Sequence, residues 1–371
     1  MRIAFLSLFE AYPPASGAAY VTYNCARLTP CTALLVQLAD REAVEQLANL
    51  TIVSLRQQAS SRLKKLAYMP LTISRMRKEV AKFRPGYVVL EGASWAVYLA
   101  LIALVLRKTL PKVKIIYHAH NVEYLLRQEQ SNPFVTALTK WAERYILTTC
   151  DRSFAVSEDD RQRFFALYGV LPSLLPNGVD CSAYLVPAAE IEVVRKRFAI
   201  TDESILFMGL YGYPPNTEAV RFLADQVMPA LHHQRPNLRL VVTGGGPPVS
   251  PPWLINTGVI SRRDLNAVIC ACRLGVAPIF RGSGTRLKIL EYMAAGLPVV
   301  STRKGAEGLN LDADKNVLYA ETAAEFQRAL LRLLCDSSLS KNLSLQAATL
   351  VRSNFDWPPL LRHFASELES L

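Results

Sequence analysis

The stretch GSGTRLKILEYMAAGLPVV, at residues 282–300, contains the residue types best suited to bind a phosphorylated ligand. Its glycines precede a helical pattern that we expect to begin near Thr285 and to carry Arg286 and Lys288 in its first turn. Cations are unfavourable there, because the first N–H groups of a helix are unpaired and its dipole is positive at that end. A phosphate in front of the helix would reverse this, since N–H groups and cations would share one anion. An ordinary surface helix in which Lys288 pairs with Glu291 is an equally good interpretation.

The elements that must position this stretch form two α/β halves. A chain of 371 residues is too long for one ordinary core. Apolar runs alternate with helical patterns in both halves, which is typical of parallel, doubly wound sheets. The expected strands lie at residues 2–8, 51–55, 87–92, 112–118, 152–157, 204–209, 238–244, 274–279 and 297–302. The expected helices lie near 18–28, 60–83, 94–108, 132–149, 158–167, 216–232, 262–272, 285–295 and 323–334.

The join between the halves is predicted within LPNGVD, residues 175–180, where proline and glycine interrupt the pattern. Ligands of doubly wound sheets bind beyond the carboxyl ends of the strands, in the loops that lead into helices. The loop before residue 285 occupies such a position, after the expected strand 274–279. Two such domains in tandem predict a cleft between the carboxyl edges of their sheets.

The formal net charge of +11 is concentrated in a basic segment, residues 56–84. This segment contains a single acid, Glu79, and the basic residues Arg56, Arg62, Lys64, Lys65, Arg75, Arg77, Lys78, Lys82 and Arg84. Such an excess attracts anions, and the interleaved apolar residues favour an anionic membrane surface over DNA. A solvated helix face is the alternative. No zinc spacing or nucleic-acid signature appears, so no nucleic-acid partner is expected.

Several other classes of protein and of binding site are not expected. The N-terminus reads as a buried strand without a signal-peptide cleavage pattern, and the longest apolar run, 95–106, is too short to span a bilayer. The seven cysteines lack metal spacing and are expected to be buried thiols in a reducing cytoplasm. Asp312 and Asp314 have a spacing that can hold a divalent ion, but we expect them to lie in a solvated loop. We expect the protein to use no metal and no other cofactor. The glycines at 244–246 lack the dinucleotide fingerprint.

The stretch GSGTRLKILEYMAAGLPVVST resembles the sugar-nucleotide signature of retaining glycosyltransferases of the GT-B fold, in family 4 (group 1). Other segments resemble the family in the expected order: SLFEAYPPASGAAYV, HAHNVEY, FAVSEDDRQRF, LPNGVD, LFMGLYGYPPNTEAVRFL, LVVTGGGPP and FDW. The resemblance implies two Rossmann-like domains, with residues 1–177 binding the acceptor and residues 178–355 binding the nucleotide sugar. It also implies that a C-terminal helix at about 356–371 packs back onto the first domain.

In the second domain the resemblance assigns Glu291 to the ribose, because a carboxylate accepts two hydrogen bonds from a vicinal diol. The family's preceding Glu would fall at Ser283, which is a departure shared with a subgroup that has G-G/S-G-T-R-L-K. The family's usual Arg and Lys after the first strand are also absent, so Arg286 and Lys288 are the candidates to bind the diphosphate. The other expected substrate-binding residues of this domain are Gly209, Gly282, Ser283, Gly284, Thr285 and Leu287.

In the first domain Gly17 matches a glycine loop, although Ala18 stands where the family often has a second glycine. A plain strand-to-helix turn is the alternative for Gly17. His120 in HAHNVEY matches the family's histidine near the reacting sugar, and His118 lies on the same side of the strand. A structural role is the alternative for both histidines, and we prefer His120 over His118 as the catalytic residue.

The resemblance implies a hexosyl-type glycosyltransferase that uses a UDP- or GDP-linked sugar and retains the anomeric configuration. Its acceptor would be a glycan or a lipid-linked glycan, at the inner, cytoplasmic face of a membrane. Helix N–H groups with Arg286 or Lys288 would stabilise the departing diphosphate, while His120 holds a sugar with oxocarbenium character. Two alternatives are a non-catalytic GT-B protein that binds a glycan or partner, and a sugar-nucleotide epimerase.

Overall fold

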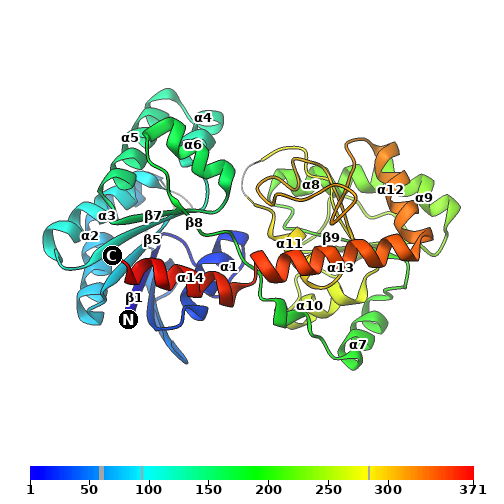
Figure 1. Cartoon of the computed structure of the whole chain (residues 1–371), viewed down its shortest axis with the longest axis horizontal. Coiled ribbons are helices and arrows are strands. Elements are labelled where there is room, and N and C mark those ends of the chain that lie inside the picture. The colour runs from blue at the N-terminus through cyan, green and yellow to red at the C-terminus, as the bar shows by residue number, and fades with distance from the viewer. Residues whose placement is uncertain (58–61, 93–94, 283–284) are drawn as a thin grey trace. The chain divides into compact units, whose positions relative to one another are not determined.

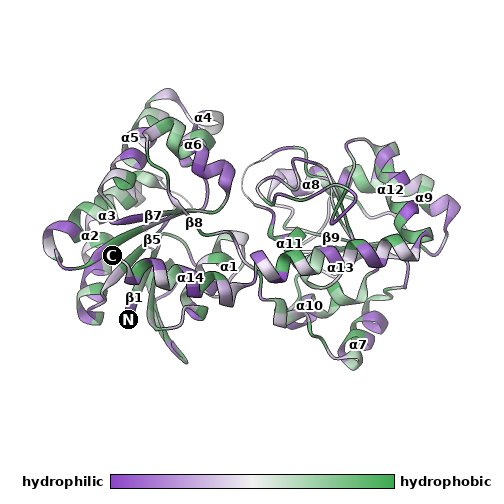
Figure 2. Ribbon diagram, viewed as in Figure 1, coloured by the Kyte–Doolittle hydropathy of each residue, from purple (hydrophilic) through white to green (hydrophobic). Residues whose placement is uncertain are grey.

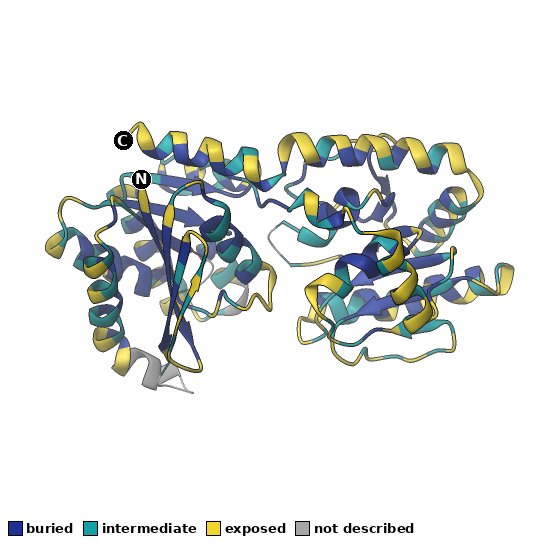
Figure 3. Cartoon of the chain, turned by 90° about the horizontal axis from the view of Figure 1, so that it is seen from below, coloured by how far each residue is buried: buried dark blue, intermediate teal, exposed yellow. Residues whose placement is uncertain are grey.

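The computed structural model describes residues 1–57, 62–92, 95–282 and 285–371, which form two compact units (Figure 1). Unit 1 comprises Met1–Asn177 and Trp357–Leu371, and unit 2 comprises Gly178–Asp356. Each unit is a mainly parallel sheet covered by helices, so the predicted α/β class is confirmed. The strands are mostly hydrophobic (Figure 2) and buried (Figure 3), whereas the helices expose their outer faces.

The eight strands of unit 1 follow the order β3-β4-β2-β1-β5-β6-β7-β8. Only the β3–β4 pair is antiparallel among the pairs that the structure describes. The strands are β1 (Arg2–Ser7), β2 (Thr32–Ala39), β3 (Ala43–Leu47), β4 (Leu50–Arg56), β5 (Tyr87–Gly92), β6 (Lys114–Ala119), β7 (Arg152–Ala155) and β8 (Ser173–Leu174). The helices are α1 (Gly17–Leu28), α2 (Arg62–Phe83), α3 (Ala96–Thr109), α4 (Glu123–Gln130), α5 (Pro133–Thr149), α6 (Glu158–Tyr168) and α14 (Trp357–Glu369).

Unit 2 has a six-stranded parallel sheet in the order β11-β10-β9-β12-β13-β14. Its strands are β9 (Ser204–Met208), β10 (Arg239–Thr243), β11 (Leu254–Asn256), β12 (Leu274–Ala277), β13 (Val299–Ser301) and β14 (Leu318–Tyr319). Its helices are α7 (Ala188–Phe198), α8 (Pro214–Phe222), α9 (Met228–Gln234), α10 (Arg262–Ala271), α11 (Leu287–Ala294), α12 (Ala323–Cys335) and α13 (Ser337–Asn354). A 3₁₀ turn, η1 (Cys181–Tyr184), precedes α7, and a π turn, η2 (Leu223–Val227), separates α8 from α9.

Helix α14 completes unit 1 by packing against α1 (Figure 1). Trp357 is fully buried, and the ring of Phe364 meets that of Phe154 on β7 edge to face, with centroids 5.0 Å apart. Glu367 adds an ion pair at 3.1 Å to Arg152. The C-terminal helix is therefore part of the core of unit 1 rather than an appendage.

The structure corrects sequence predictions about one helix and about the cysteines. The single helix expected at 216–232 is divided, because Pro229 has no N–H for the preceding turn and its ring crowds that turn, which widens into η2. The expectation that the cysteines are buried is confirmed for Cys25 and Cys272 and is wrong for the exposed Cys335, while the other four are half-buried. No helix in the described part of the chain combines the length and the apolar character that crossing a membrane requires.

Candidate functional site

The two histidines predicted from the sequence meet a buried carboxylate at the carboxyl edge of the unit 1 sheet. Glu91 on β5 pairs in register with His118 on β6, and His120 follows one residue after that strand. Glu91 Oε2 lies 3.2 Å from His118 Nδ1 and 2.5 Å from His120 Nε2. Thr22 of α1 donates its hydroxyl to the same oxygen at 2.9 Å. One carboxylate thus connects α1, β5 and β6.

These groups are held in an unusual electrostatic state. Burial opposes ionisation of Glu91, but His118 and His120 outweigh it and hold the pKa of Glu91 well below its usual range. Burial also lowers the pKa of His120, although Glu91 partly offsets this. The carboxylate is therefore ionised, and the His120 ring favours its neutral form at neutral pH.

A second buried acid, Glu143 on α5, fixes the segment that follows His120. Its carboxylate accepts the N–H groups of Glu123 and Tyr124 at the start of α4 and the hydroxyl of Tyr168. Burial raises the pKa of Glu143 to about 7. Glu91 and Glu143 were not predicted from the sequence. A charged residue inside an apolar run, as in YVVLEG, is the signal that indicates the first of them.

Among the described residues, Glu91, His118 and His120 are also the group whose donor atoms could hold a metal ion, all lying within 4.8 Å of one another. Two imidazoles and a carboxylate suit zinc chemically. However, ligands of one tetrahedral zinc lie about 3.3 Å apart, given metal–ligand distances of about 2.0 Å. The 2.5 Å between Glu91 and His120 fits a hydrogen bond better. Asp312 and Asp314 are exposed and pair with Lys315 and Arg332.

Gly17 opens α1 as its first residue, and the preceding Ser16 caps the helix by accepting the N–H of Ala19 at 3.2 Å. The loop before it is fixed by Gln37 on β2, whose side chain binds the backbone of Ala11 and Tyr12. Gly17 has an ordinary helical backbone. Its conformation therefore fits the plain strand-to-helix turn that was the alternative interpretation.

In unit 2 the helix at the centre of the sequence argument begins later than expected. α11 starts at Leu287, and Arg286 is its N-cap with an extended backbone, so only Lys288 lies in the first turn. Thr285 precedes the cap, while Ser283 and Gly284 lie outside the described residues. Gly282 has a φ of +100°, which favours glycine, and the side chain of Arg286 donates to the carbonyl of Arg281 at 3.3 Å.

Lys288 points toward the loop that follows β9. Its ammonium donates to Asn216 Oδ1 on α8 at 2.9 Å and lies 4.2 Å from the ring centroid of Phe207 on β9. Burial, helped by the charge of Arg286, lowers the pKa of Lys288 to about 7. The alternative in which Lys288 pairs with Glu291 on an ordinary surface helix is wrong, because Lys288 instead reaches the carboxyl edge of the sheet.

Glu291 lies one turn further along α11 and is buried. Its Oε1 accepts the hydroxyl of Tyr184 at 3.1 Å and forms an ion pair with Arg262, the first residue of α10. Arg262 also donates to Tyr184 at 2.8 Å. Arg262 and Tyr184 were not predicted. They orient the carboxylate through one of its two oxygens.

Glycines let the loops after β9 and β10 approach each other. A Cβ on Gly209 would lie 2.7 Å from Cγ of Asn216, the residue that also contacts Lys288. Gly244 has a φ of +105°, and a Cβ there would lie 2.2 Å from the carbonyl oxygen of Gly209. Side chains at either position would displace Asn216 or the loop itself. The absence of a side chain at Gly209 therefore leaves room for Asn216, the residue that Lys288 contacts.

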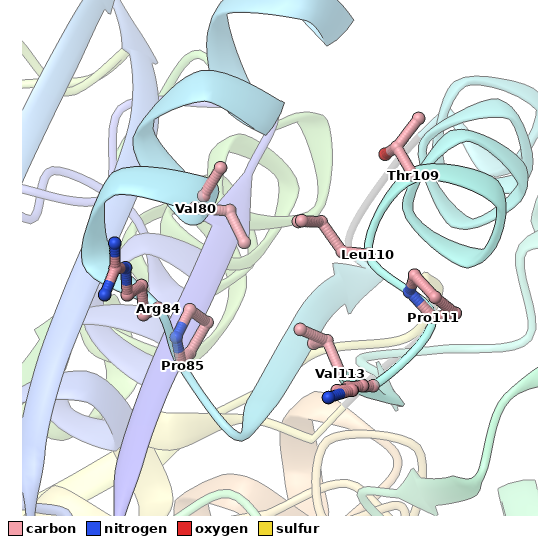
Figure 4. Close-up of a pocket in the computed structure, with 9 residues that line it drawn as sticks. Val80, Arg84, Pro85, Thr109, Leu110, Pro111 and Val113 are labelled. Carbon is pink, nitrogen blue, oxygen red and sulfur yellow. The ribbon is translucent and has the colours of Figure 1, made fainter.

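A separate cavity of about 330 Å³ lies at the opposite edge of unit 1, before β5 and β6 rather than after them (Figure 4). Apolar side chains such as Val80, Leu110 and Val113 line it, with Arg84 and Lys112 among the lining residues. None of the predicted site residues line this cavity. It is distinct from the carboxyl edge that carries Glu91 and His120.

The basic segment is only partly free for an external partner. Met69, Ile73 and Met76 of α2 are buried in the core of unit 1, whereas Tyr68 and Leu71 are exposed. Arg75 forms an ion pair with Glu42. The side chains of Arg62, Lys64 and Lys65 lie outside the described residues.

Two Rossmann-like units with candidate side chains at their carboxyl edges define the GT-B class of glycosyltransferase fold, as predicted. The chain belongs to the group 1 glycosyltransferases. A family model described as Glycosyltransferase Family 4 matches residues 34–183, and one described as Glycosyl transferases group 1 matches residues 202–336.

Solved structures of the same fold cover the whole chain. HepE of Anabaena, solved in complex with UDP and glucose, is similar with a TM-score of 0.78 and 16% identity, over 100% of both chains. Sucrose-phosphate synthase of Thermosynechococcus elongatus is similar with a TM-score of 0.78 and 16% identity, over 100% of this chain and 99% of that one.

A curated relative is the phosphatidyl-myo-inositol mannosyltransferase of Propionibacterium freudenreichii subsp. shermanii. It is 25% identical over 235 residues, which are 61% of this chain and 58% of the relative. This chain therefore spans less than two thirds of that relative's length.

Proposed function

We propose that the chain transfers a sugar from a UDP- or GDP-linked donor to an acceptor hydroxyl, with unit 2 binding the donor. The observation that carries this is the presence of both a cation, Lys288, and a buried carboxylate, Glu291, on one short helix at the carboxyl edge of the sheet. The carboxylate suits the ribose diol, and the ammonium suits the diphosphate. Arg286 and the loop around Gly282 are proposed to complete the phosphate site.

The chemistry follows from the charges that develop during transfer. Cleavage between the anomeric carbon and the diphosphate leaves negative charge on the phosphate and positive charge on the sugar ring. The N–H groups at the start of α11 and the Lys288 ammonium would stabilise the departing diphosphate. His120 of unit 1 would hold a sugar hydroxyl. We propose that the acceptor attacks from the leaving-group face, so that the anomeric configuration is retained, and that no metal ion takes part.

A panel of UDP- and GDP-sugars tests this function. Each is offered with and without glycan acceptors in the presence of EDTA, and we expect a nucleotide sugar to raise the melting temperature and to release its nucleoside diphosphate. Product formed without an acceptor as an epimerised nucleotide sugar would favour an epimerase. Binding without any turnover would favour a non-catalytic protein, which the Ser283 departure also allows. Activity that EDTA abolishes and a divalent ion restores would contradict metal independence.

We propose further that the acceptor is a glycan or a lipid-linked glycan and that unit 1 binds a membrane through α2. The exposed Tyr68 and Leu71 lie on the same helix as the excess of Arg and Lys. Apolar and basic side chains together favour an anionic interface. The curated relative's name, phosphatidyl-myo-inositol mannosyltransferase, includes a lipid.

The chain is therefore expected to sediment with anionic vesicles at low salt and to be released at high salt. Replacing Arg62, Lys64 and Lys65 by Glu is expected to weaken this binding about 100-fold or more, since each charge near the surface contributes about 1 kcal/mol. The matched control makes the same charge change at the exposed Lys196, Arg328 and Lys341 of unit 2 and is expected to have little effect. A wild-type chain that stays in the supernatant with anionic vesicles at low salt would rule out the membrane proposal.

A further inference from the structure

The buried carboxylate of Glu91 accepts hydrogen bonds from three different side chains. Their donors are Thr22 Oγ1, His118 Nδ1 and His120 Nε2, and all four side chains are buried. An ionised carboxylate has no proton to donate. Each ring nitrogen that faces Glu91 must therefore carry the proton of its hydrogen bond.

This requirement fixes which ring nitrogen of each histidine carries a proton. His118 donates from Nδ1, whereas His120 donates from Nε2, and a neutral His120 ring then has its lone pair on Nδ1. Nε2 of His118 is buried and has no hydrogen-bond partner among the described residues. The burial that lowers the pKa of His120 keeps its ring in this neutral form at neutral pH.

Burying the Glu91 carboxylate costs more free energy than a purely structural role at this position would require. Removing a carboxylate from water is unfavourable, and an apolar side chain at the end of β5 would fill the same space without that cost. A buried charged residue at the end of a strand is expected where it contributes to a functional site. The cluster joins α1 to the end of β5, which carries Glu91, and to the end of β6, which carries both histidines.

We infer that Glu91 is a positioning residue that makes His120 a hydrogen-bond acceptor at Nδ1, so that His120 selects a hydroxyl group of a sugar. This rests on the proposed function, which supplies the sugar. A hydroxyl can donate to the lone pair of Nδ1. A phosphate or carboxylate oxygen would be repelled by it while the ring is neutral. The specificity for a hydroxyl thus depends on Glu91, which contacts His120 and not the sugar.

The test begins with the tautomers in the full-length, ligand-free chain, measured by ¹⁵N NMR of the histidine rings and assigned with His118→Gln and His120→Gln. We expect His120 to be protonated at Nε2 and unprotonated at Nδ1, and His118 to be protonated at Nδ1. Glu91→Gln keeps the shape but replaces one acceptor oxygen by an NH₂ donor. The amide oxygen can take the place of Oε2, to which all three donors point, but it carries no negative charge. Both histidine rings then lose their ionised partner, and we expect their ¹⁵N signals to shift.

The kinetic arm uses the sugar donor found in the panel experiment. Glu91→Gln is expected to lower kcat/KM about 10- to 100-fold, because misplacement of a substrate-contacting group costs up to about 100-fold, and to change the pH profile. Adding His120→Ala to Glu91→Gln should cause less further loss than His120→Ala causes alone, because Glu91 acts through His120. Thr22→Val is the matched control, since it removes a donor to the same carboxylate and should leave both tautomers unchanged.

Three results would overturn the inference. They are a wild-type His120 protonated at Nδ1, identical histidine spectra in wild type and Glu91→Gln, and a stoichiometric metal ion bound to the cluster after dialysis. The NMR arm needs no turnover. A failure of the transferase proposal therefore leaves the tautomers measurable, and a failure of the tautomer prediction leaves the transferase proposal standing.

Discussion

Glu291→Ala is expected to weaken the binding of UDP or GDP about 100-fold, because two hydrogen bonds to a charged acceptor contribute about 1.5 kcal/mol each. The chain is expected to stay folded. Arg262, which loses its partner, has a side chain that is 40% exposed and can turn to water. Isothermal titration of the nucleoside diphosphates measures the loss.

Two variants separate the ribose role of Glu291 from its role in packing. Glu291→Gln retains one acceptor oxygen and should bind with intermediate affinity. Arg262→Ala removes the ion-pair partner but keeps the carboxylate, and Tyr184 still donates to it, so only a small loss is expected. An affinity for UDP and GDP that is unchanged in Glu291→Ala would contradict the ribose assignment.

Lys288→Met is expected to lower kcat/KM about 100- to 1,000-fold, as the loss of one group that stabilises developing negative charge does in other enzymes. The thermal unfolding midpoint should not fall, since methionine keeps the apolar length of the side chain beside Phe207. The kinetic parameters with the best sugar donor measure this effect. A Lys288→Met variant with wild-type kcat/KM would show that Lys288 does not bind the diphosphate.

The same lysine predicts a pH dependence. Its pKa is about 7 without ligand, and a bound diphosphate favours the ammonium form, so the pKa rises on binding. Between these two pKa values binding takes up a proton, and the affinity for UDP falls as the pH rises above about 7, by up to about tenfold per pH unit. The terminal phosphate of UDP, with a second pKa of about 6, is already ionised there.

Titrations from about pH 6 to pH 9 in two buffers with different ionisation enthalpies measure this proton uptake. Lys288→Met should remove the slope. Lys315→Met is the control, because Lys315 is an exposed lysine of the same unit that pairs with Asp312. An affinity that does not change above pH 7 in the wild type would show that Lys288 does not face the phosphates.

The fold was largely predictable because most strands are continuous apolar runs rich in Val and Ile. β2 was missed because TALLVQLA is rich in Leu and Ala, which favour helices as much as strands. The late start of α11 was missed because an extended backbone at Arg286 depends on the loop before it. A local pattern contains no information about that loop.

The candidate site was predictable where its residues share one motif. His118 and His120 are two residues apart, and Lys288 and Glu291 lie on one helix, so spacing alone brought them together. Glu91 is far from the histidines along the chain, and Arg262 is far from Glu291. These pairs meet only because parallel strands and neighbouring helices bring their ends together. Periodicity cannot reveal such pairs.

The place of α14 determines the order in which the chain can fold as it is synthesised. Unit 1 begins at Met1, yet its core needs Trp357 and Phe364, which leave the ribosome after all of Gly178–Asp356. Domains usually complete in the order of their synthesis. Of the two units, the one translated earlier is therefore the later to complete its core. A nascent chain that ends at Asp356 holds every residue of unit 2 but lacks the helix that unit 1 requires.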